Sequence, residues 1–157
     1  MSSTEAAPSG AYDISTDPAR LDVAAIHAYL TRSYWSAGIP IGTVKNALEH
    51  SLCFGVYERA SGAQVGLARV VTDYATFAYL CDVYVLEEHR GFGLAKRMMR
   101  ELMVHPALAG ARRIMLATRD AHGLYAAFGF LEAGAKKNLM EIVRPEIYAA
   151  RNGTGSF

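Results

Sequence analysis

One stretch of the sequence, residues 80–102, limits most strongly what this chain can fold into. It begins with a run rich in β-branched and aromatic residues, crosses a short polar turn with two glycines, and continues with apolar residues at helical spacing. The apolar positions after the turn recur at steps of three and four residues: Leu94, Ala95, Met98, Met99, Leu102 and Met103. The stretch therefore predicts a strand, a tight turn and an amphipathic helix.

Two glycines, Gly91 and Gly93, lie where this helix is expected to begin. The first N–H groups of a helix have no partner inside it, and glycine lets a ligand approach them closely. The peptide dipoles favour an anion at this end, and Arg90 adds a positive charge. The alternative is that the glycines only form a tight turn and Arg90 is solvated. A dinucleotide fingerprint fails because Lys96 replaces its third glycine, and the Gly-Lys-Ser/Thr of a Walker loop is absent.

Two short motifs carry a resemblance to a known family. Arg90-Gly91-Phe92-Gly93-Leu94-Ala95 fits a pattern of Arg or Gln, any two residues, Gly, any residue, and Gly or Ala. Downstream, residues 124–130 read Leu-Tyr, three further residues and Gly-Phe. In this order and separation the motifs resemble the GNAT superfamily of acyl-CoA-dependent N-acetyltransferases. The resemblance covers residues 77–131 well, and the rest of the chain by the order of its elements.

The size of the chain, 157 residues and 17.0 kDa, suits one domain with a sizeable core. We expect a single GNAT domain at residues 11–148, a disordered N-terminus at 1–10 and a loose tail at 149–157. Three strand-like runs within residues 52–86 are joined by short links and predict an antiparallel meander. The strand at 113–118 follows a whole helix and is expected to run parallel to the strand before it.

These patterns predict an α/β (α+β) fold with about four helices and a mixed sheet of six to seven strands. In the resembled fold the parallel strand pair is splayed to hold CoA. Strands are expected at 11–15, 52–58, 64–72, 77–86, 113–118 and 139–143. Helices are expected after Asp17-Pro18, at 41–48, at 94–103 and at 121–128.

Composition narrows the class of partner. Apolar residues make up 52% of the chain and charged residues 20%, as in soluble globular proteins, and the net charge of +1 implies neither a nucleic-acid nor a membrane partner. Residues 1–10 lack the basic start and apolar core of a signal peptide, and no apolar run reaches membrane-spanning length. We therefore expect a cytoplasmic protein. Cys53 and Cys81 fall in apolar runs and are expected to be buried free thiols.

The resemblance implies acetyl-CoA as co-substrate and no metal. In the family, backbone groups of the strand before the first motif bind the pantetheine arm, which assigns this role to Val83, Tyr84 and Val85. The first turn of the following helix binds the pyrophosphate. This assigns the phosphate contacts to Arg90, Gly91, Phe92, Gly93, Leu94, Ala95 and Lys96.

The resemblance also implies catalytic residues. Tyr125 takes the place of the family's general acid, which protonates the leaving thiolate, and a phenol with an ordinary pKa of about 10 carries the proton at neutral pH. The alternative is that Tyr125 only packs. Strand alternation places Asp82 on the face of Tyr84, which makes Asp82 the first candidate for a base, although a sheet-edge hydrogen bond also explains it. Other ionisable candidates for the base, besides a water relay, are Glu58, Glu141 and His122.

The acceptor side is less defined. In the family the segment at residues 31–40 lies over the acceptor pocket, so Tyr34 and Trp35 are expected either to line that pocket or to pack the helix pair. Thr118 stands where many members have an asparagine that contacts the cofactor. Arg113 stands where members that act on protein N-termini often have a glutamate, which argues against that activity.

Together these features predict an N-acetyltransferase that moves an acetyl group from acetyl-CoA to a primary amine of a small molecule. The amine would attack directly in a ternary complex, and the enzyme could be a homodimer. The alternatives are a catalytically silent acyl-CoA-binding or regulatory module and an acetyltransferase of peptide or protein amines. A plain nucleotide-binding α/β domain is disfavoured by the mixed strand order and the failed fingerprints.

Overall fold

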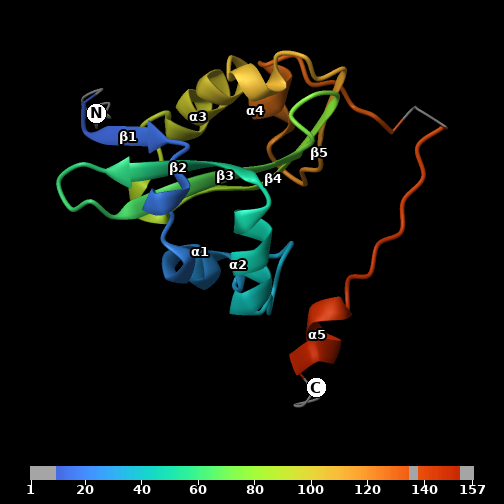
Figure 1. Ribbon diagram of the computed structural model, residues 1–157, viewed down its shortest axis with the longest axis horizontal. Coiled ribbons are helices and arrows are strands. Elements are labelled where there is room, and N and C mark those ends of the chain that lie inside the picture. The colour runs from blue at the N-terminus through green and yellow to red at the C-terminus, as the bar shows by residue number, and fades with distance from the viewer. Residues whose placement is uncertain (1–9, 135–137, 153–157) are drawn as a thin grey trace, which may run out of the picture.

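A computed structural model describes residues 10–134 and 138–152. One sheet has the strand order β1-β2-β3-β4-β5, with α1 and α2 on one face and α3 and α4 on the other (Figure 1). The strands are β1 (Tyr12–Ser15), β2 (Leu52–Glu58), β3 (Gln64–Thr72), β4 (Phe77–Val85) and β5 (Arg113–Leu116). The α-helices are α1 (Val23–Leu30), α2 (Ile41–Glu49), α3 (Leu94–Met103), α4 (His122–Ala126) and α5 (Ile147–Asn152).

The topology confirms the predicted meander and the parallel pair. Strands β1 to β4 pair antiparallel in chain order, and β5 joins β4 in parallel after the crossover through α3. The last pair between β4 and β5 is Leu80 with Leu116, whereas β4 continues to Val85. Because β5 ends at Leu116, pairing between the two strands stops at Leu80, and in the described part of the chain residues 81–85 of β4 have no partner strand on this side.

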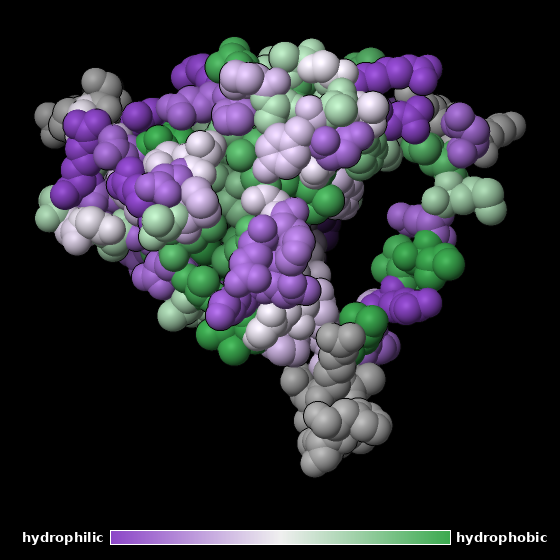
Figure 2. All heavy atoms as spheres, viewed as in Figure 1, coloured by the Kyte–Doolittle hydropathy of each residue, from purple (hydrophilic) through white to green (hydrophobic). Residues whose placement is uncertain are grey.

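The predicted number of strands was wrong. The described residues form five strands, not six to seven, because the closing strand expected at 139–143 does not form. Met140 and Ile142 are 96% and 84% exposed, and Figure 2 shows an open space between this segment and the body. Apolar alternation makes a strand only where a neighbouring strand supplies hydrogen-bond partners, and this segment lies away from the sheet edge (Figure 1).

The helix count also differs, since residues 10–134 and 138–152 contain five α-helices rather than about four. The additional helix is α5, which begins at Ile147 and so reaches into the segment expected as a tail. The first predicted helix start is a short 3₁₀ helix, Pro18–Arg20, and α1 begins later with the carboxylate of Asp22 accepting from Ala25 N–H. The expectations for residues 1–9 and 153–157 lie outside the described residues.

The sheet separates two clusters of buried side chains. The apolar stripe of α3, with Met98, Met99 and Leu102 fully buried, packs on one face, and α1 and α2 pack on the other. Cys53 is buried and Cys81 half-buried, and both are free thiols. Burial raises the pKa of Cys53 to about 11 and that of Cys81 to about 12, so neither thiol ionises at neutral pH.

A β-bulge interrupts β4. Leu67 pairs with Tyr84 and Arg69 pairs with Cys81, so Asp82 and Val83 together lie opposite a single residue of β3. Asp82 adopts a left-handed conformation, with φ of 52°. Leu80 accordingly packs in the cluster on the α3 face and Tyr84 in the cluster on the α1–α2 face, which strict alternation would not allow.

One buried hydroxyl gives a stability prediction. The Oη of Tyr57 on β2 is buried and has no hydrogen-bond partner within the described residues. A buried polar group without a partner costs about 1–3 kcal/mol. We expect Tyr57→Phe to raise the free energy of unfolding by about 1 kcal/mol, measured by urea denaturation. A loss of stability would mean that the hydroxyl makes an undetected hydrogen bond.

Candidate active site

The site begins where the pairing between β4 and β5 stops. A cleft of about 1110 Å³ opens there, somewhat larger than the roughly 300–1,000 Å³ of common ligand pockets. Four segments line it: the loop between α1 and α2, the second half of β4, the turn that leads into α3, and the stretch from β5 to α4. Residues of both motifs that carry the family resemblance therefore line the cleft, together with the loop expected to face the acceptor.

The glycine turn before α3 has an open helix start on the cleft. Gly91 and Gly93 have φ values of 87° and 76°, and a Cβ added to either would meet nothing within 4 Å. Gly93 is the N-cap of α3, and no described side chain caps this helix. The N–H groups of the first turn therefore have no side-chain cap from the described residues, and N–H groups of this kind bind phosphate in proteins.

Arg90 is held at the end of β4. Its Nε donates to the carbonyl of Val85 at 2.9 Å, and its Nη2 donates to the hydroxyl of Tyr29 at 3.1 Å. Although the side chain is 52% exposed, these two contacts direct it to the cleft. The guanidinium is therefore held at the cleft by the Val85 carbonyl and the Tyr29 hydroxyl rather than fully solvated, and its Nη2 lies 3.9 Å from Glu87 Oε1.

The structure brings most of the predicted cofactor residues to the cleft, but not all of them. Phe92 does not line it: its ring lies 6.2 Å from that of Tyr12 and packs against the core. Only the backbone of Phe92 remains for a phosphate contact. The predicted residues that line the cleft are Val83, Tyr84, Val85, Arg90, Gly91, Gly93, Leu94, Ala95, Lys96, Tyr125, Tyr34 and Trp35.

Tyr125 projects from α4 into the cleft and is 8% exposed. Burial, with smaller contributions from Tyr34 and Asp120, raises the pKa of its phenol above the ordinary value. The hydroxyl therefore keeps its proton at neutral pH, which a general acid needs. Thr118 accepts a hydrogen bond from Ala121 N–H at 3.1 Å, so its hydroxyl supports the loop before α4.

Aromatic rings form one side of the cleft. Tyr29 stacks on Tyr84 at 3.9 Å, Trp35 lies 6.2 Å from Tyr29, and Tyr34 meets Trp35 edge-on at 5.0 Å. Tyr34 and Trp35 thus line the cleft and pack with their neighbours, and their contact with an acceptor stays a prediction. The guanidinium of Arg119 lies 3.8 Å over the ring of Tyr34.

Sequence reasoning missed Tyr29, Arg119 and Arg32 as cleft residues. Tyr29 lies on the apolar side of α1, and its position opposite Tyr84 depends on packing across 55 residues of sequence. Arg32 stacks at 4.4 Å on Tyr29 and makes a bidentate pair with Glu87 at 2.9 and 3.1 Å. Arg32 holds the pKa of Glu87 down at about 2, so this carboxylate is charged and paired. Only the aromatic character of Tyr29 could have drawn attention to it.

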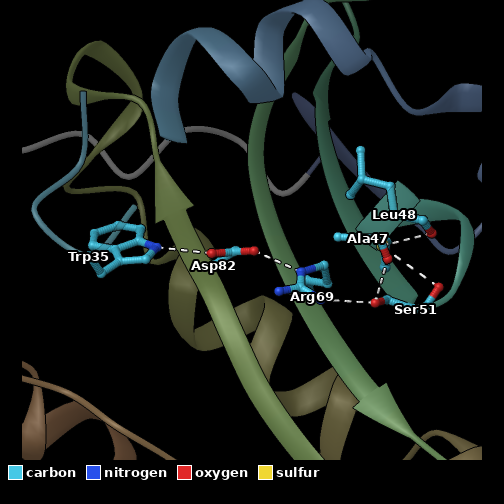
Figure 3. Close-up of polar contacts among 7 residues, drawn as sticks. Trp35, Ala47, Leu48, Ser51, Arg69 and Asp82 are labelled. Atoms are coloured by element: carbon cyan, nitrogen blue, oxygen red, sulfur yellow. Dashed lines mark hydrogen bonds and ion pairs between the residues drawn. The ribbon is translucent and has the colours of Figure 1, made fainter. Parts of the chain in front are cut away.

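The candidates for a catalytic base lie elsewhere. Asp82 does not line the cleft, and its two oxygens accept from Trp35 and Arg69 (Figure 3). Glu58 accepts from Ser61 and does not line the cleft, and neither does exposed Glu141 or His122. The base therefore stays a prediction.

Across residues 10–134 and 138–152, no three His, Cys, Asp or Glu side chains gather as a metal ion requires. Within the same residues, no helix is long and apolar enough to span a membrane.

Comparison with known proteins agrees with the architecture. The chain is 49% identical in sequence to a candidate GNAT acetyltransferase of Xanthomonas campestris pv. campestris, whose crystal structure matches 88% of this chain and 96% of its own with a TM-score of 0.84. It is 39% identical to a candidate acetyltransferase of Gibberella zeae, over 74% of this chain and 76% of that protein.

More distant structures share the fold. Glucosamine-6-phosphate N-acetyltransferase of Arabidopsis thaliana is 16% identical, with a TM-score of 0.60 over 84% of this chain and 97% of its own. The sequence profile of the Acetyltransferase (GNAT) family matches residues 12–130, which include every strand of the sheet and the lining of the cleft. The chain therefore belongs to the GNAT family of acetyltransferases.

Proposed function

We propose that this protein transfers an acetyl group from acetyl-CoA to a primary amine of a small molecule. The observation that carries the proposal is that β4, among the described residues, has no partner strand on the β5 side after Leu80, on the cleft that the uncapped start of α3 also lines. A strand edge without a partner can pair with the amides of a pantetheine arm, as an added strand would. The helix start beyond it then receives the pyrophosphate.

Each lining segment has a role in this proposal. Backbone groups of residues 83–85 bind the pantetheine amides, and a backbone N–H there polarises the thioester carbonyl. The turn and first residues of α3 bind the phosphates. The aromatic wall formed by Tyr34 and Trp35 receives the body of the amine from the side opposite the phosphates.

The reaction is a direct transfer. The amine nitrogen forms a bond to the carbonyl carbon, the carbon–sulfur bond breaks, and Tyr125 Oη gives its proton to the departing sulfur. The amine loses its own proton to water, because none of the four side chains considered as a base lines the cleft, and water returns a proton to the Tyr125 phenolate. The free thiols of Cys53 and Cys81 support a reducing compartment, the cytoplasm.

A second function, a silent acyl-CoA-binding module, is favoured by one observation. None of the four side chains considered as a base, Asp82, Glu58, Glu141 or His122, lines the cleft. Such a module would bind acetyl-CoA in the same place without turnover.

The first experiment is calorimetric titration with acetyl-CoA and with CoA, followed by thiol-release assays with a panel of small amines and short peptides. Micromolar binding with thiol release from small amines is the expected result. Release with peptides alone would point to a peptide or protein acceptor. Binding without release would favour the silent module, and no binding would overturn the proposal.

A further inference from the structure

Asp82 has a conformation and a set of contacts that the proposed reaction does not use. It adopts φ of 52° at the bulge of β4, a conformation that residues other than glycine rarely keep without strong support from their surroundings. Its side chain is 9% exposed. Its environment must therefore hold the carboxylate firmly.

Two hydrogen bonds supply that support (Figure 3). The indole Nε1 of Trp35 donates to Oδ1 at 2.9 Å, and Arg69 Nε donates to Oδ2 at 2.7 Å. Arg69 also donates to Ser51 Oγ at 3.0 Å, which in turn donates to the carbonyl of Ala47 at 2.7 Å. The carboxylate thus connects the loop between α1 and α2, the bulge, strand β3 and the end of α2.

Trp35 needs such a contact to keep one orientation. Its side chain is on the cleft and the residue is 37% exposed. Its ring meets Tyr29 at 6.2 Å in a tilted geometry and Tyr34 edge-on, so neither ring stacks flat against it. Within the described residues, the indole Nε1 makes a hydrogen bond to the Asp82 carboxylate. This bond is charge-assisted and directional, so it can fix the orientation of the ring.

We propose that Asp82 is a positioning residue for the acceptor amine, acting through Trp35. By holding the indole against the bulge, it keeps the aromatic wall of the acceptor side at a set place relative to the part of β4 assigned to the thioester. This inference rests on the proposed acetyl transfer. A catalytic base would have to reach the amine. The Asp82 carboxylate instead bonds to the indole and does not line the cleft.

The first test uses fluorescence, because Trp35 is the only tryptophan of the chain. In the free protein, Asp82→Ala is expected to raise the acrylamide quenching constant of Trp35 at least twofold and to shift its emission, with far-UV circular dichroism unchanged. Asp13→Ala is the control: it breaks another carboxylate–arginine pair, at 2.7 Å to Arg59, on β1, which β2 and β3 separate from β4, and should leave the emission unchanged. Unchanged quenching in Asp82→Ala would overturn the contact.

The second test is a double-mutant cycle on steady-state kinetics with the amine of highest kcat/KM in the panel. Asp82→Ala and Trp35→Phe are each expected to raise the KM for the amine about tenfold, with kcat and the Kd for acetyl-CoA within twofold of wild type. The double variant should show the same tenfold increase rather than a hundredfold one, because Asp82 acts through Trp35. The acid limb of the kcat pH profile should be retained in Asp82→Ala.

Other outcomes separate the possibilities. A large loss of kcat in Asp82→Ala together with loss of the acid limb would make Asp82 the base and overturn the positioning role, as would additive effects in the cycle. If Asp82→Ala does not fold, because Arg69 is left buried without its partner, the pair Asp82→Ala with Arg69→Met replaces it in both tests. If wild type binds no acetyl-CoA, the proposed function fails, while the quenching test still decides the Asp82–Trp35 contact.

Discussion

Gly93→Glu is expected to weaken acetyl-CoA binding at least a hundredfold in calorimetric titration, which corresponds to roughly 3 kcal/mol. A Cβ at this position projects into open space at the start of α3, where the proposed pyrophosphate lies. The glutamate would fill that space and place a negative charge beside the phosphates. The free N–H groups of the first helical turn would then face a side-chain carboxylate instead of the ligand.

Gly62→Glu is the matched control for this variant. Gly62 also has a positive φ, 73°, with nothing within 4 Å of an added Cβ, but it lies in the turn between β2 and β3. The backbone strain of adding a side chain is therefore similar in the two variants, and only the place differs. We expect Gly62→Glu to bind acetyl-CoA like wild type. Normal binding by Gly93→Glu would remove the helix start as the phosphate site.

Tyr125→Phe is expected to lower kcat by about 10²–10³-fold, in the range that proton transfer by a positioned side chain contributes. The Kd for acetyl-CoA should stay within twofold, because the ring and its packing remain. Because the pKa of Tyr125 is raised, its phenol is protonated at neutral pH. Ionisation of Tyr125 should therefore lower the kcat of wild type only above pH of about 10. Steady-state thiol release measures kcat and its pH dependence, and calorimetric titration measures the Kd for acetyl-CoA.

The control is Tyr57→Phe, the same change at another buried tyrosine, which is 3% exposed and does not line the cleft. It should leave kcat unchanged. If Tyr125→Phe also leaves kcat unchanged, Tyr125 is not the general acid, and solvent must protonate the leaving thiolate.

The spacing of apolar residues correctly predicted the helices and strands that depend mainly on local burial. The periodicity of α3 and the apolar runs of β2, β3 and β4 match the observed elements within about one residue, because α3 buries one face and the strands are covered on both faces. The parallel placement of β5 followed from the crossover through a helix. The roles of Tyr125 and of the turn at residues 90–95 came from the resemblance to the family.

Longer-range contacts could not be predicted in the same way. The bulge at Asp82 changes which residues of β4 share a face, and nothing in the run Leu80-Cys81-Asp82-Val83 marks a residue with positive φ. The bond from Trp35 spans 47 residues of sequence, so pattern alone placed Asp82 near the amine rather than behind the indole. The prediction of a closing strand at 139–143 was wrong for a related reason. A strand needs a partner strand, and sequence alternation does not specify one.

The unequal pairing of β4 has a consequence for amide hydrogen exchange. Along its first four residues, Phe77 to Leu80, the strand has β3 on one side and β5 on the other, but beyond Leu80 only β3 remains. Amides of residues 81–85 that face the gap are therefore open to deuterium in the free protein, while their neighbours bonded to β3 are protected. Acetyl-CoA should slow exchange on the gap side alone, so that one strand reports both the stability of the sheet and the occupancy of the cleft.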